Sequence, residues 1–379
     1  MRAFFLLALG FLVACSDSKS EPPADAAPPP PPCTPAGPTA TPATPEIELA
    51  RSIADRWILV HPAEGLEWNW TDAVLMTSIV ELWRRTADVR YRDYLQRWID
   101  HHVKEGYYVT TSDRCLPAVA ANELYRTTCK TEYRTVNETV LRYLYDEARR
   151  TDDGGINHLG TSTIFPPTLW VDSLYMFGEV LIRWGEAEND TRALDEFQKQ
   201  YLLFAKHLQD ASGWFVHGYQ WGTPQDPNVY WARGNGWVLA AGYDYLRVRN
   251  DDAVKASLAK LASAVVAAQD TSGLYWTVVN RPNETYLETS ASALFATGLA
   301  RGRRIGALDA NVVPVVRKAI EGIKTKLVND DQGRPVVTGT SGPTNVGGFD
   351  NYARIEVEDD LPYGVGAVIL ALVGASGLQ

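Results

Sequence analysis

The chain has 379 residues, of which 45% are hydrophobic and 22% charged, and its formal net charge is −10. It contains no run of Lys and Arg, so a nucleic-acid-binding function is excluded. The six His and four Cys show no metal-ligand spacing, and we therefore expect neither a metal nor another cofactor. The composition does not indicate an oligomeric state.

The N-terminus has the layout of a secretory signal. Met1 and Arg2 precede about a dozen apolar residues, too few to span a bilayer as a mature helix. The segment ends in LVAC, which is similar to a bacterial lipobox with Cys15 as the lipidated residue; an ordinary signal with an incidental cysteine is the alternative. We expect residues 1–15 to be a lipoprotein signal and the protein to reside in the bacterial cell envelope, on the periplasmic face or the cell surface.

Residues 16–45 are dominated by Pro, Ala, Thr and Ser and include the unbroken run from Pro28 to Pro32. Proline removes a backbone donor and fixes φ, so no packed core can form there. We expect a disordered linker that attaches the folded part to the membrane only through the lipid anchor. The folded domain is then expected to cover residues 46–379.

Two cysteines flank one predicted helix. Cys115 and Cys129 would lie on the order of 20 Å apart along a continuous helix. A disulfide requires Cα atoms within about 7 Å. We expect no bridge between these two residues.

A repeat of about sixty residues organises the remaining chain. Similar turn sequences begin at Arg150, Gln209, Gln269 and Asn329, and a fixed period indicates repeated supersecondary units. Two helical patterns fit between successive turns. The helices expected along the chain cover residues 46–60, 72–87, 92–104, 116–127, 133–144, 171–184, 192–208, 236–249, 254–265, 290–301, 312–327 and 363–373. These patterns predict an all-α fold, a closed α/α barrel of about six helical hairpins; an open solenoid is the alternative.

Aromatic residues, His, Asp and Arg gather at the predicted helix boundaries. Aromatic faces stack on sugar rings, and Arg pairs with carboxylates. In YWARGNGW the glycines at 234 and 236 indicate a turn at a helix entrance that presents Trp231 and Arg233 to a ligand. We therefore expect an anionic oligosaccharide as the binding partner.

Four segments carry a more specific resemblance. WARGNGW, LWVDSLYM, TYLETSASALFATGLA and DLPYGVGAVILAL resemble the signature segments of the unsaturated rhamnogalacturonyl hydrolases, glycoside hydrolase family 105, which is related to family 88. The Gly-Asn-Gly sequence favours family 105. The resemblance implies an (α/α)6 barrel. It also implies hydrolysis by hydration, in which an Asp protonates C4 of a 4,5-unsaturated uronic acid and water adds at C5.

The resemblance also implies roles for individual residues. Asp172 matches the general acid and base, and Asp113 matches a second catalytic carboxyl that holds water and sugar. The residues that match substrate-binding positions are His158, His217, Arg233, Trp231, Trp237, Trp170 and Trp70. Two neighbours depart from the family pattern, because Asn157 replaces a usual Trp and Leu159 replaces a frequent Lys. The parent polysaccharide stays open among rhamnogalacturonan, other pectins and ulvan-like polymers.

Simpler interpretations exist for several of these residues. Asp172 could cap the helix that begins beside it, and Asp113 could mark a helix start. Arg233 could pair with a structural carboxylate. Glu288 is expected to support a helix start. For Asp172 as a general acid, we expect burial to raise its pKa more than the helix N-terminus lowers it.

Two further classes of function remain possible. The first is a conventional two-carboxylate glycosidase, or a polysaccharide lyase, on the same barrel. The second is a non-catalytic surface lipoprotein that captures oligosaccharides. Such a capture protein would keep the tryptophans but would not need Asp172.

Overall fold

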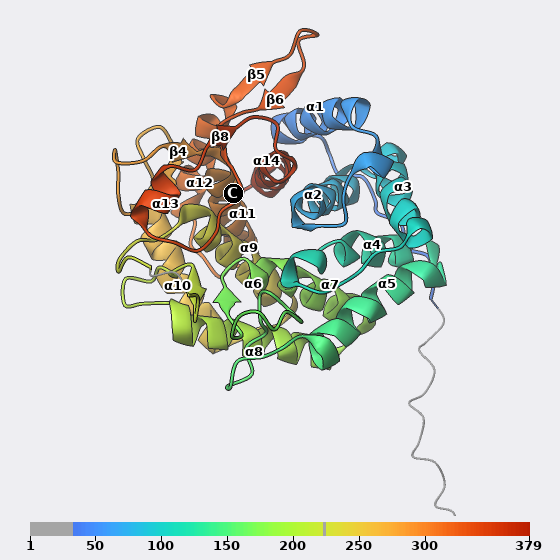
Figure 1. The fold of residues 1–379 in the computed structure, drawn as a ribbon. Coiled ribbons are helices and arrows are strands. Elements are labelled where there is room, and N and C mark those ends of the chain that lie inside the picture. Colours follow the sequence, from blue (N-terminus) through green and yellow to red (C-terminus); the bar gives the residue numbers. More distant parts are fainter. Residues whose placement is uncertain (1–32, 223–224) are drawn as a thin grey trace, which may run out of the picture. The chain divides into compact units, whose positions relative to one another are not determined.

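The computed structural model describes residues 33–222 and 225–379, so the predicted signal peptide with Cys15 lies outside the described residues. Within the unit formed by Thr34–Gln379, helices alternate between an outer and an inner ring (Figure 1). The outer helices are α1 (Pro45–Val60), α3 (Val89–Glu105), α5 (Thr131–Arg142), α8 (Thr191–Leu208), α10 (Asp252–Ala267) and α12 (Val312–Lys324). The inner helices are α2 (Trp70–Thr86), α4 (Ala118–Thr128), α7 (Gly178–Glu188), α9 (Ala232–Val248), α11 (Thr289–Arg304) and α14 (Pro362–Ala375).

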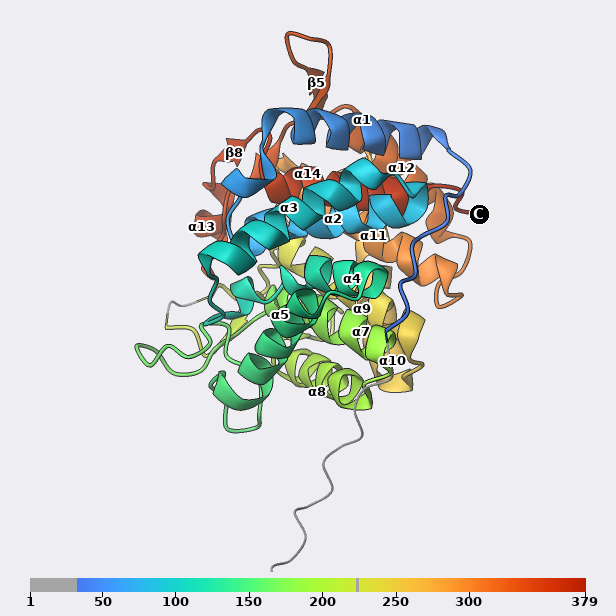
Figure 2. The ribbon, with the colours of Figure 1, turned by 90° about the vertical axis from the view of Figure 1, so that its right-hand side faces the viewer.

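The inner ring is closed, because each of its helices contacts the next and α14 contacts α2 (Figures 1 and 2). This arrangement confirms the all-α barrel of six hairpins. Inner helices are buried on nearly every side, as α9 is from Ala232 to Tyr245, whereas outer helices such as α8 bury one apolar stripe.

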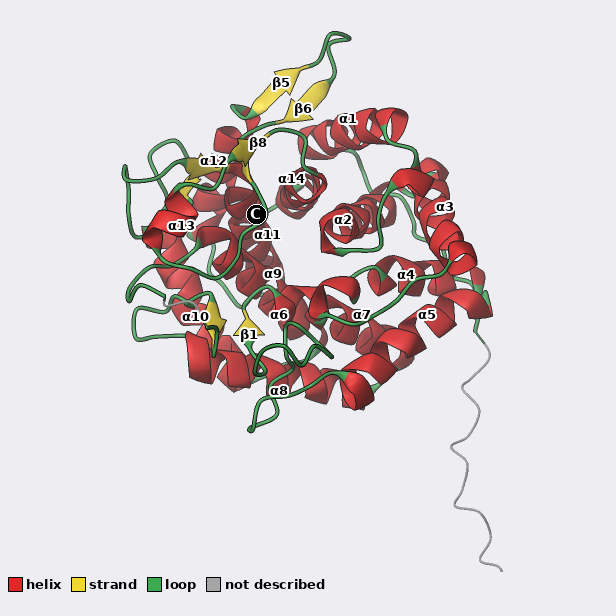
Figure 3. Ribbon diagram, in the orientation of Figure 1, coloured by secondary structure: helices red, strands yellow, loops and turns green. Residues whose placement is uncertain are grey.

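Short elements complete the connections between the helices (Figure 3). The helical ones are η1 (Ala63–Gly65), η2 (Ser112–Arg114), the π-helical η3 (Tyr143–Glu147), α6 (Ser173–Met176) and α13 (Phe349–Ala353). The strands form antiparallel pairs, which are β1 (Leu169–Trp170) with β2 (Gly218–Tyr219), β3 (Tyr275–Trp276) with β4 (Leu287–Glu288), β5 (Leu327–Asn329) with β6 (Pro335–Val337), and β7 (Thr340–Ser341) with β8 (Val357–Glu358).

The predicted helix boundaries hold to within a few residues, with two corrections. The helix expected over residues 171–184 is divided at Phe177 into α6 and α7. The Gly-Asn-Gly sequence is not a turn, because it lies inside the first turns of α9. An added Cβ would lie 2.7 Å from Val171 Cγ2 at Gly234 and 2.7 Å from Leu294 Cβ at Gly236. These glycines therefore allow close packing within the barrel and do not form a loop.

The sixty-residue repeat corresponds to a recurring tight turn. Gly154, Gly213, Gly273 and Gly333 all have positive φ, between +74° and +95°, a conformation that glycine adopts without steric cost. Each donates its N–H to the carbonyl three residues earlier. The Gln269 amide then links this turn to α12, since it donates to the carbonyls of Gly273 (3.0 Å) and Val315 (2.9 Å).

The structure shows the state of three cysteines and adds residues to the N-terminal side of the expected domain. Cys115 is a buried free thiol, which confirms that it forms no bridge with Cys129. Cys33 and Cys129 are each disulfide-bonded. Part of the predicted linker belongs to the fold, because the Ala36 and Thr41 N–H groups donate to carbonyls of α4 and α2. The folded domain therefore includes residues before position 46, the boundary expected from the sequence.

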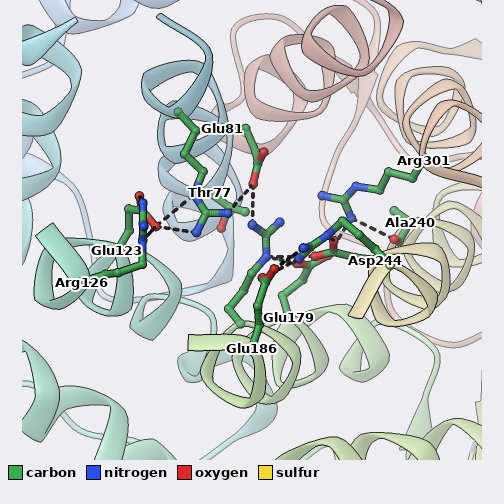
Figure 4. A network of polar contacts seen from close by, with 12 residues as sticks. Thr77, Glu81, Glu123, Arg126, Glu179, Glu186, Ala240, Asp244 and Arg301 are labelled. Carbon is green, nitrogen blue, oxygen red and sulfur yellow. Dashed lines mark hydrogen bonds and ion pairs between the residues drawn. The ribbon is translucent and has the colours of Figure 1, made fainter. Parts of the chain in front are cut away.

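A network of arginines and carboxylates fills the barrel end where the inner helices terminate (Figure 4). Arg183 is buried and lies 2.7 Å from Glu81, 2.9 Å from Asp244 and 3.3 Å from Glu179. Burial, with the negative charge of Asp244 beside it, raises the pKa of Glu179 to about 7. Arg301 binds Glu179 and also the Ala240 carbonyl. These bonds tie the inner helices together and leave the opposite end for a ligand.

Among the described residues, no helix is long and apolar enough to cross a membrane.

The repeated turn gives a stability prediction with an internal control. At Gly273 the backbone has φ +89°, and an added Cβ would overlap the Lys318 carbonyl oxygen; at Gly333 φ is +74° and no atom lies within 4 Å. Gly333→Ala should cost about 1–2 kcal/mol from backbone strain alone. Gly273→Ala should cost clearly more, because the turn must also move away from α12. Urea unfolding of both variants measures this; equal losses would contradict the proposed packing.

Candidate active site

A pocket of about 90 Å³ lies at the end of the barrel where the inner helices begin. The residues that line it are Trp70, Asp113, His158, Trp170, Asp172, Met176, Trp231, Arg233, Pro343, Thr344 and Asn345. All the predicted site residues except His217 and Trp237 are in this set. A larger cavity of about 560 Å³, beside Pro45, Arg317 and Leu378, contains none of them.

A short sheet places Asp172 beside His217. The pairing of β1 with β2 brings Trp170 opposite Gly218, and the Val171 N–H donates to the His217 carbonyl at 3.0 Å. Asp172 occupies the N-cap position of α6, but within the described chain its carboxylate accepts no helix N–H. Its Oδ2 instead lies 3.1 Å from His217 Nε2. Helix capping therefore does not explain this carboxylate.

The Asp172–His217 pair has its charge on the carboxylate. Burial alone would raise the pKa of Asp172, but the hydrogen bond from His217 lowers it below its usual value. Burial lowers the pKa of His217, although Asp172 opposes this. In the free protein we therefore assign an ionised Asp172 and a neutral His217. The expectation that burial dominates at Asp172 is wrong.

Asp113 and His158 form the facing side of the pocket. Asp113 Oδ2 lies 3.9 Å from His158 Nε2, and its side chain is 32% exposed. Burial and the charge of Asp172 raise the pKa of Asp113, while His158 lowers it, and the net shift is upward. His158 stacks on Trp170 at 4.2 Å and lies 3.0 Å from Ser173 Oγ. Two carboxyls with pKa values shifted in opposite directions thus share one pocket, a typical arrangement for acid–base chemistry.

Arg233 is engaged with main chain and not with solvent. Its side chain is 1% exposed, and its terminal nitrogens donate to the carbonyls of Ser341 and Gly342, both at 2.8 Å, and to Thr344 Oγ1 at 3.0 Å. Glu288, the nearest carboxylate that pairs with it, is 3.8 Å away. Arg233 therefore holds the loop whose Pro343, Thr344 and Asn345 form one wall of the pocket. It is not the free cation that the sequence suggested.

Glu288 holds the same loop from the other side. It is the N-cap of α11, where its carboxylate accepts from the backbone N–H groups of Ser290 and Ala291, which confirms its expected support of a helix start. It also accepts the Ser341 N–H at 2.9 Å. The pocket wall is thus fixed by two buried, oppositely charged side chains.

Three buried N–H groups at the pocket lack an acceptor. Arg233 Nε, Trp231 Nε1 and Trp170 Nε1 make no hydrogen bond to any described residue, and all three side chains line the pocket. Unpaired buried donors are costly, so an occupant rich in oxygen atoms is favoured. Sugar hydroxyl and carboxylate oxygens provide such acceptors.

Three positions that the sequence placed at the pocket, Trp237, Asn157 and Leu159, do not line it. Trp237 is fully buried against Tyr175, with ring centroids 4.7 Å apart, and belongs to the core. Asn157 is also fully buried, and its amide binds the Gly160 carbonyl and the Thr168 N–H. The departure at Asn157 therefore affects the shape of a loop and not a pocket surface. Leu159 is partly exposed and is not a lining residue.

Tyr352 and Asn235 contribute to the site without having been predicted. Tyr352 Oη lies 3.1 Å from His217 Nδ1. The Asn235 side chain binds both the N–H and the carbonyl of Phe215, two residues before His217. Asn235 lies in the Gly-Asn-Gly sequence, but no local pattern reveals its contact with Phe215 or marks Tyr352, because each acts on a segment brought to it by folding. Among the described residues, no group of three or more His, Cys, Asp or Glu could hold a metal ion.

Known proteins resemble this chain, one of them over most of its length. A relative from Bacillus subtilis, the unsaturated rhamnogalacturonyl hydrolase YesR, is 24% identical over 331 residues, which cover 82% of this chain and 91% of the relative. An unsaturated 3S-rhamnoglycuronyl hydrolase from Formosa agariphila is 30% identical over 170 residues, covering 40% of this chain and 44% of that protein.

Solved structures agree with the fold. The crystal structure of a possible family 105 member from Klebsiella pneumoniae superposes with a TM-score of 0.77 and 26% identity, over 89% of this chain and 94% of that one. The unsaturated glucuronyl hydrolase of Bacillus sp. GL1, at 17% identity and a TM-score of 0.70, shares the fold over 86% of this chain and 95% of its own. The family model of Glycosyl Hydrolase Family 88 matches residues 50–377, and the protein is therefore a glycoside hydrolase that belongs to this family.

Proposed function

We propose that the protein removes a 4,5-unsaturated uronic acid from the non-reducing end of oligosaccharides left by a polysaccharide lyase. The observation that carries this proposal is the ionised Asp172, paired with neutral His217 and facing Asp113 in a pocket of unpaired N–H donors. The names of the Bacillus and Formosa relatives support the same substrate class.

The reaction is a hydration followed by ring opening. A proton is added to C4 of the C4=C5 bond, and a water molecule supplies its oxygen to C5 and releases a proton. The resulting hemiketal at C5 opens when the bond between C5 and the ring oxygen breaks. C5 becomes a ketone, and the former ring oxygen becomes a hydroxyl on C1, which still carries the leaving sugar. This hemiacetal then breaks into an aldehyde and the free sugar, and one water is consumed overall.

Asp172 is the proposed proton-transferring group. Because it is ionised in the free protein, it must take up a proton before it can act as an acid. A bound uronate adds negative charge and excludes water, and both effects raise the pKa of a neighbouring carboxyl. Asp113, whose pKa is already raised, is the second carboxyl and would hold the water that attacks C5.

Recognition of the anionic substrate does not require an exposed arginine. The starts of α2 and α9 carry the pocket-lining residues Trp70 and Arg233, and helix N-termini favour negative charge. The pocket-lining side chains of Arg233, Trp231 and Trp170 each carry an N–H group that has no acceptor among the described residues. Together they compensate for the overall charge of −10, which would otherwise repel a uronate.

Replacement of the carboxyls tests the chemistry. Asp172→Asn should abolish most turnover, by about 10²–10⁴-fold, because an amide cannot exchange the proton. Asp113→Asn should also lower turnover, and both variants should still bind substrate. The assay follows loss of ultraviolet absorbance of the conjugated double bond in lyase-generated oligosaccharides. Because the donor must be protonated, kcat/KM should rise as pH falls from 8 towards 5.

Heavy water distinguishes hydration from direct attack at the anomeric carbon. The wild-type enzyme in deuterated buffer should place deuterium at C4 of the early product. Unlabelled C4, or near-normal turnover by Asp172→Asn, would contradict the mechanism. A gain of absorbance on intact polymer would identify a lyase, and binding without any change in absorbance would identify a capture protein.

The position of Arg233 predicts a combined effect on stability and affinity. Arg233→Lys retains the charge but cannot satisfy the Ser341 and Gly342 carbonyls and Thr344 together, so the free energy of unfolding should fall by on the order of 2–4 kcal/mol. KM should rise because the pocket wall loses its support. Arg354→Lys is the matched control, since Arg354 is 78% exposed near the same loop. Unchanged stability of Arg233→Lys would contradict the structural role.

We also propose that the protein is exported and anchored by a lipid on Cys15. The LVAC sequence supports this, and so do the disulfide-bonded Cys33 and Cys129, because disulfides persist in oxidising compartments outside the cytoplasm. Cys15→Ser should move the protein from the membrane fraction to the soluble fraction, or block its processing, without loss of activity. Membrane partitioning equal to that of the wild type would contradict the anchor.

A further inference from the structure

A continuous chain of hydrogen bonds reaches Asp172 from a distant loop. The Gly347 N–H lies 3.2 Å from Tyr352 Oη, which lies 3.1 Å from His217 Nδ1. His217 Nε2 lies in turn 3.1 Å from Asp172 Oδ2. Tyr352 is 1% exposed and His217 2%, so water cannot readily replace these partners.

Each group in this series of hydrogen bonds can be assigned as a donor or an acceptor. An ionised carboxylate can only accept, so His217 Nε2 must carry the proton. The Nδ1 of a neutral imidazole is then an acceptor, and the Tyr352 hydroxyl must donate to it. The Tyr352 oxygen remains free to accept the Gly347 N–H. The reverse arrangement would place a proton on Nδ1 and leave the Tyr352 hydroxyl hydrogen without an acceptor in the chain.

We propose that Tyr352 is a positioning residue for the reaction, because it fixes His217 as the neutral Nε2–H tautomer and thereby leaves Asp172 Oδ1 as the oxygen that exchanges the proton. Its catalytic consequence rests on the proposed function. The tautomer of His217 does not, because it follows from the two hydrogen bonds once Asp172 is ionised and the ring is neutral. Burial, which lowers the pKa of His217, acts in the same direction.

The location of Tyr352 connects this chain to Arg233. Tyr352 lies in α13, which follows the pocket loop held by Arg233. Its ring packs in a cluster with Val229, Trp231 and Val278, and it stacks on Trp231 at 6.3 Å. The same segment thus provides both a pocket wall and the donor that orients His217.

The charged and titratable groups around His217 are few. Among the described residues, those with the largest effect are Asp172, which favours the imidazolium, His158 and Arg233, which disfavour it, and the Tyr352 hydroxyl. A donor to Nδ1 stabilises only the neutral ring, because the imidazolium carries a proton there. Removing the Tyr352 hydroxyl should therefore raise the pKa of His217.

The first experiment measures the tautomer directly in the full-length protein. Nitrogen-15 NMR of labelled histidine, with the His217 signals assigned by loss in His217→Gln, should show a neutral ring protonated at Nε2 near pH 7. In Tyr352→Phe the pKa of His217 should rise measurably. A wild-type ring protonated at Nδ1, or an unchanged His217 titration in Tyr352→Phe, would overturn the proposal, and the wild-type measurement does not depend on the folding of any variant.

The second experiment measures turnover. Tyr352→Phe should lower kcat by about five- to tenfold, the effect of one lost hydrogen bond, with little change in KM and a shifted pH profile. Tyr286→Phe is the matched control, because its hydroxyl binds Ser341 Oγ at 2.9 Å in the same loop without contacting His217; its pH profile should match the wild type. Equal profiles for all three proteins would show that Tyr352 only packs. Inactivity of the wild type on unsaturated oligosaccharides would instead count against the proposed function, while the NMR result would stand.

Discussion

The common direction of the six inner helices is the constraint on which the rest of the structure depends. Each hairpin returns the chain to the same end of the barrel, so every inner helix starts near the pocket and ends near the arginine network. Helix dipoles in this arrangement place partial positive charge at the pocket and partial negative charge at the opposite end. A pocket for an anion and a cluster of arginines are complementary consequences of this geometry.

The arginine network lies where the helix C-termini place partial negative charge. Arg304 donates to the Gly374 carbonyl at the end of α14, while carboxylates such as Glu179 and Asp244 lie between the guanidinium groups of Arg183 and Arg301. Burying so many charges costs desolvation energy, and only a fully paired arrangement compensates for it. The network therefore closes this end of the barrel with polar contacts, whereas apolar side chains fill the space between the helices elsewhere.

At the pocket, charged and polar side chains bind backbone more than they bind one another. Arg233 and Glu288 hold the main chain around Ser341, Asn235 holds that of Phe215, and Asn157 holds the loop before Trp170. Loops of this kind have little apolar surface of their own, so buried polar side chains supply the bonds that a helix or sheet would provide. The catalytic carboxyls are positioned through these loops, which makes the supporting residues as important for geometry as the lining residues.

The sequence by itself determined the helices, the sixty-residue repeat, the barrel and most of the pocket residues. These features are encoded locally, by apolar periodicity, by glycines with positive φ and by motifs a few residues long. The tertiary structure decided the rest. Arg233 holds a loop because the main chain at Ser341 lies against its guanidinium group. Trp237 belongs to the core because its ring packs against Tyr175. The pKa of Asp172 is lowered because a two-stranded sheet brings His217 beside it, and Tyr352 binds His217 from 135 residues further along the chain. Hydrogen bonds and pKa shifts depend on groups that meet only after folding, which no local pattern contains.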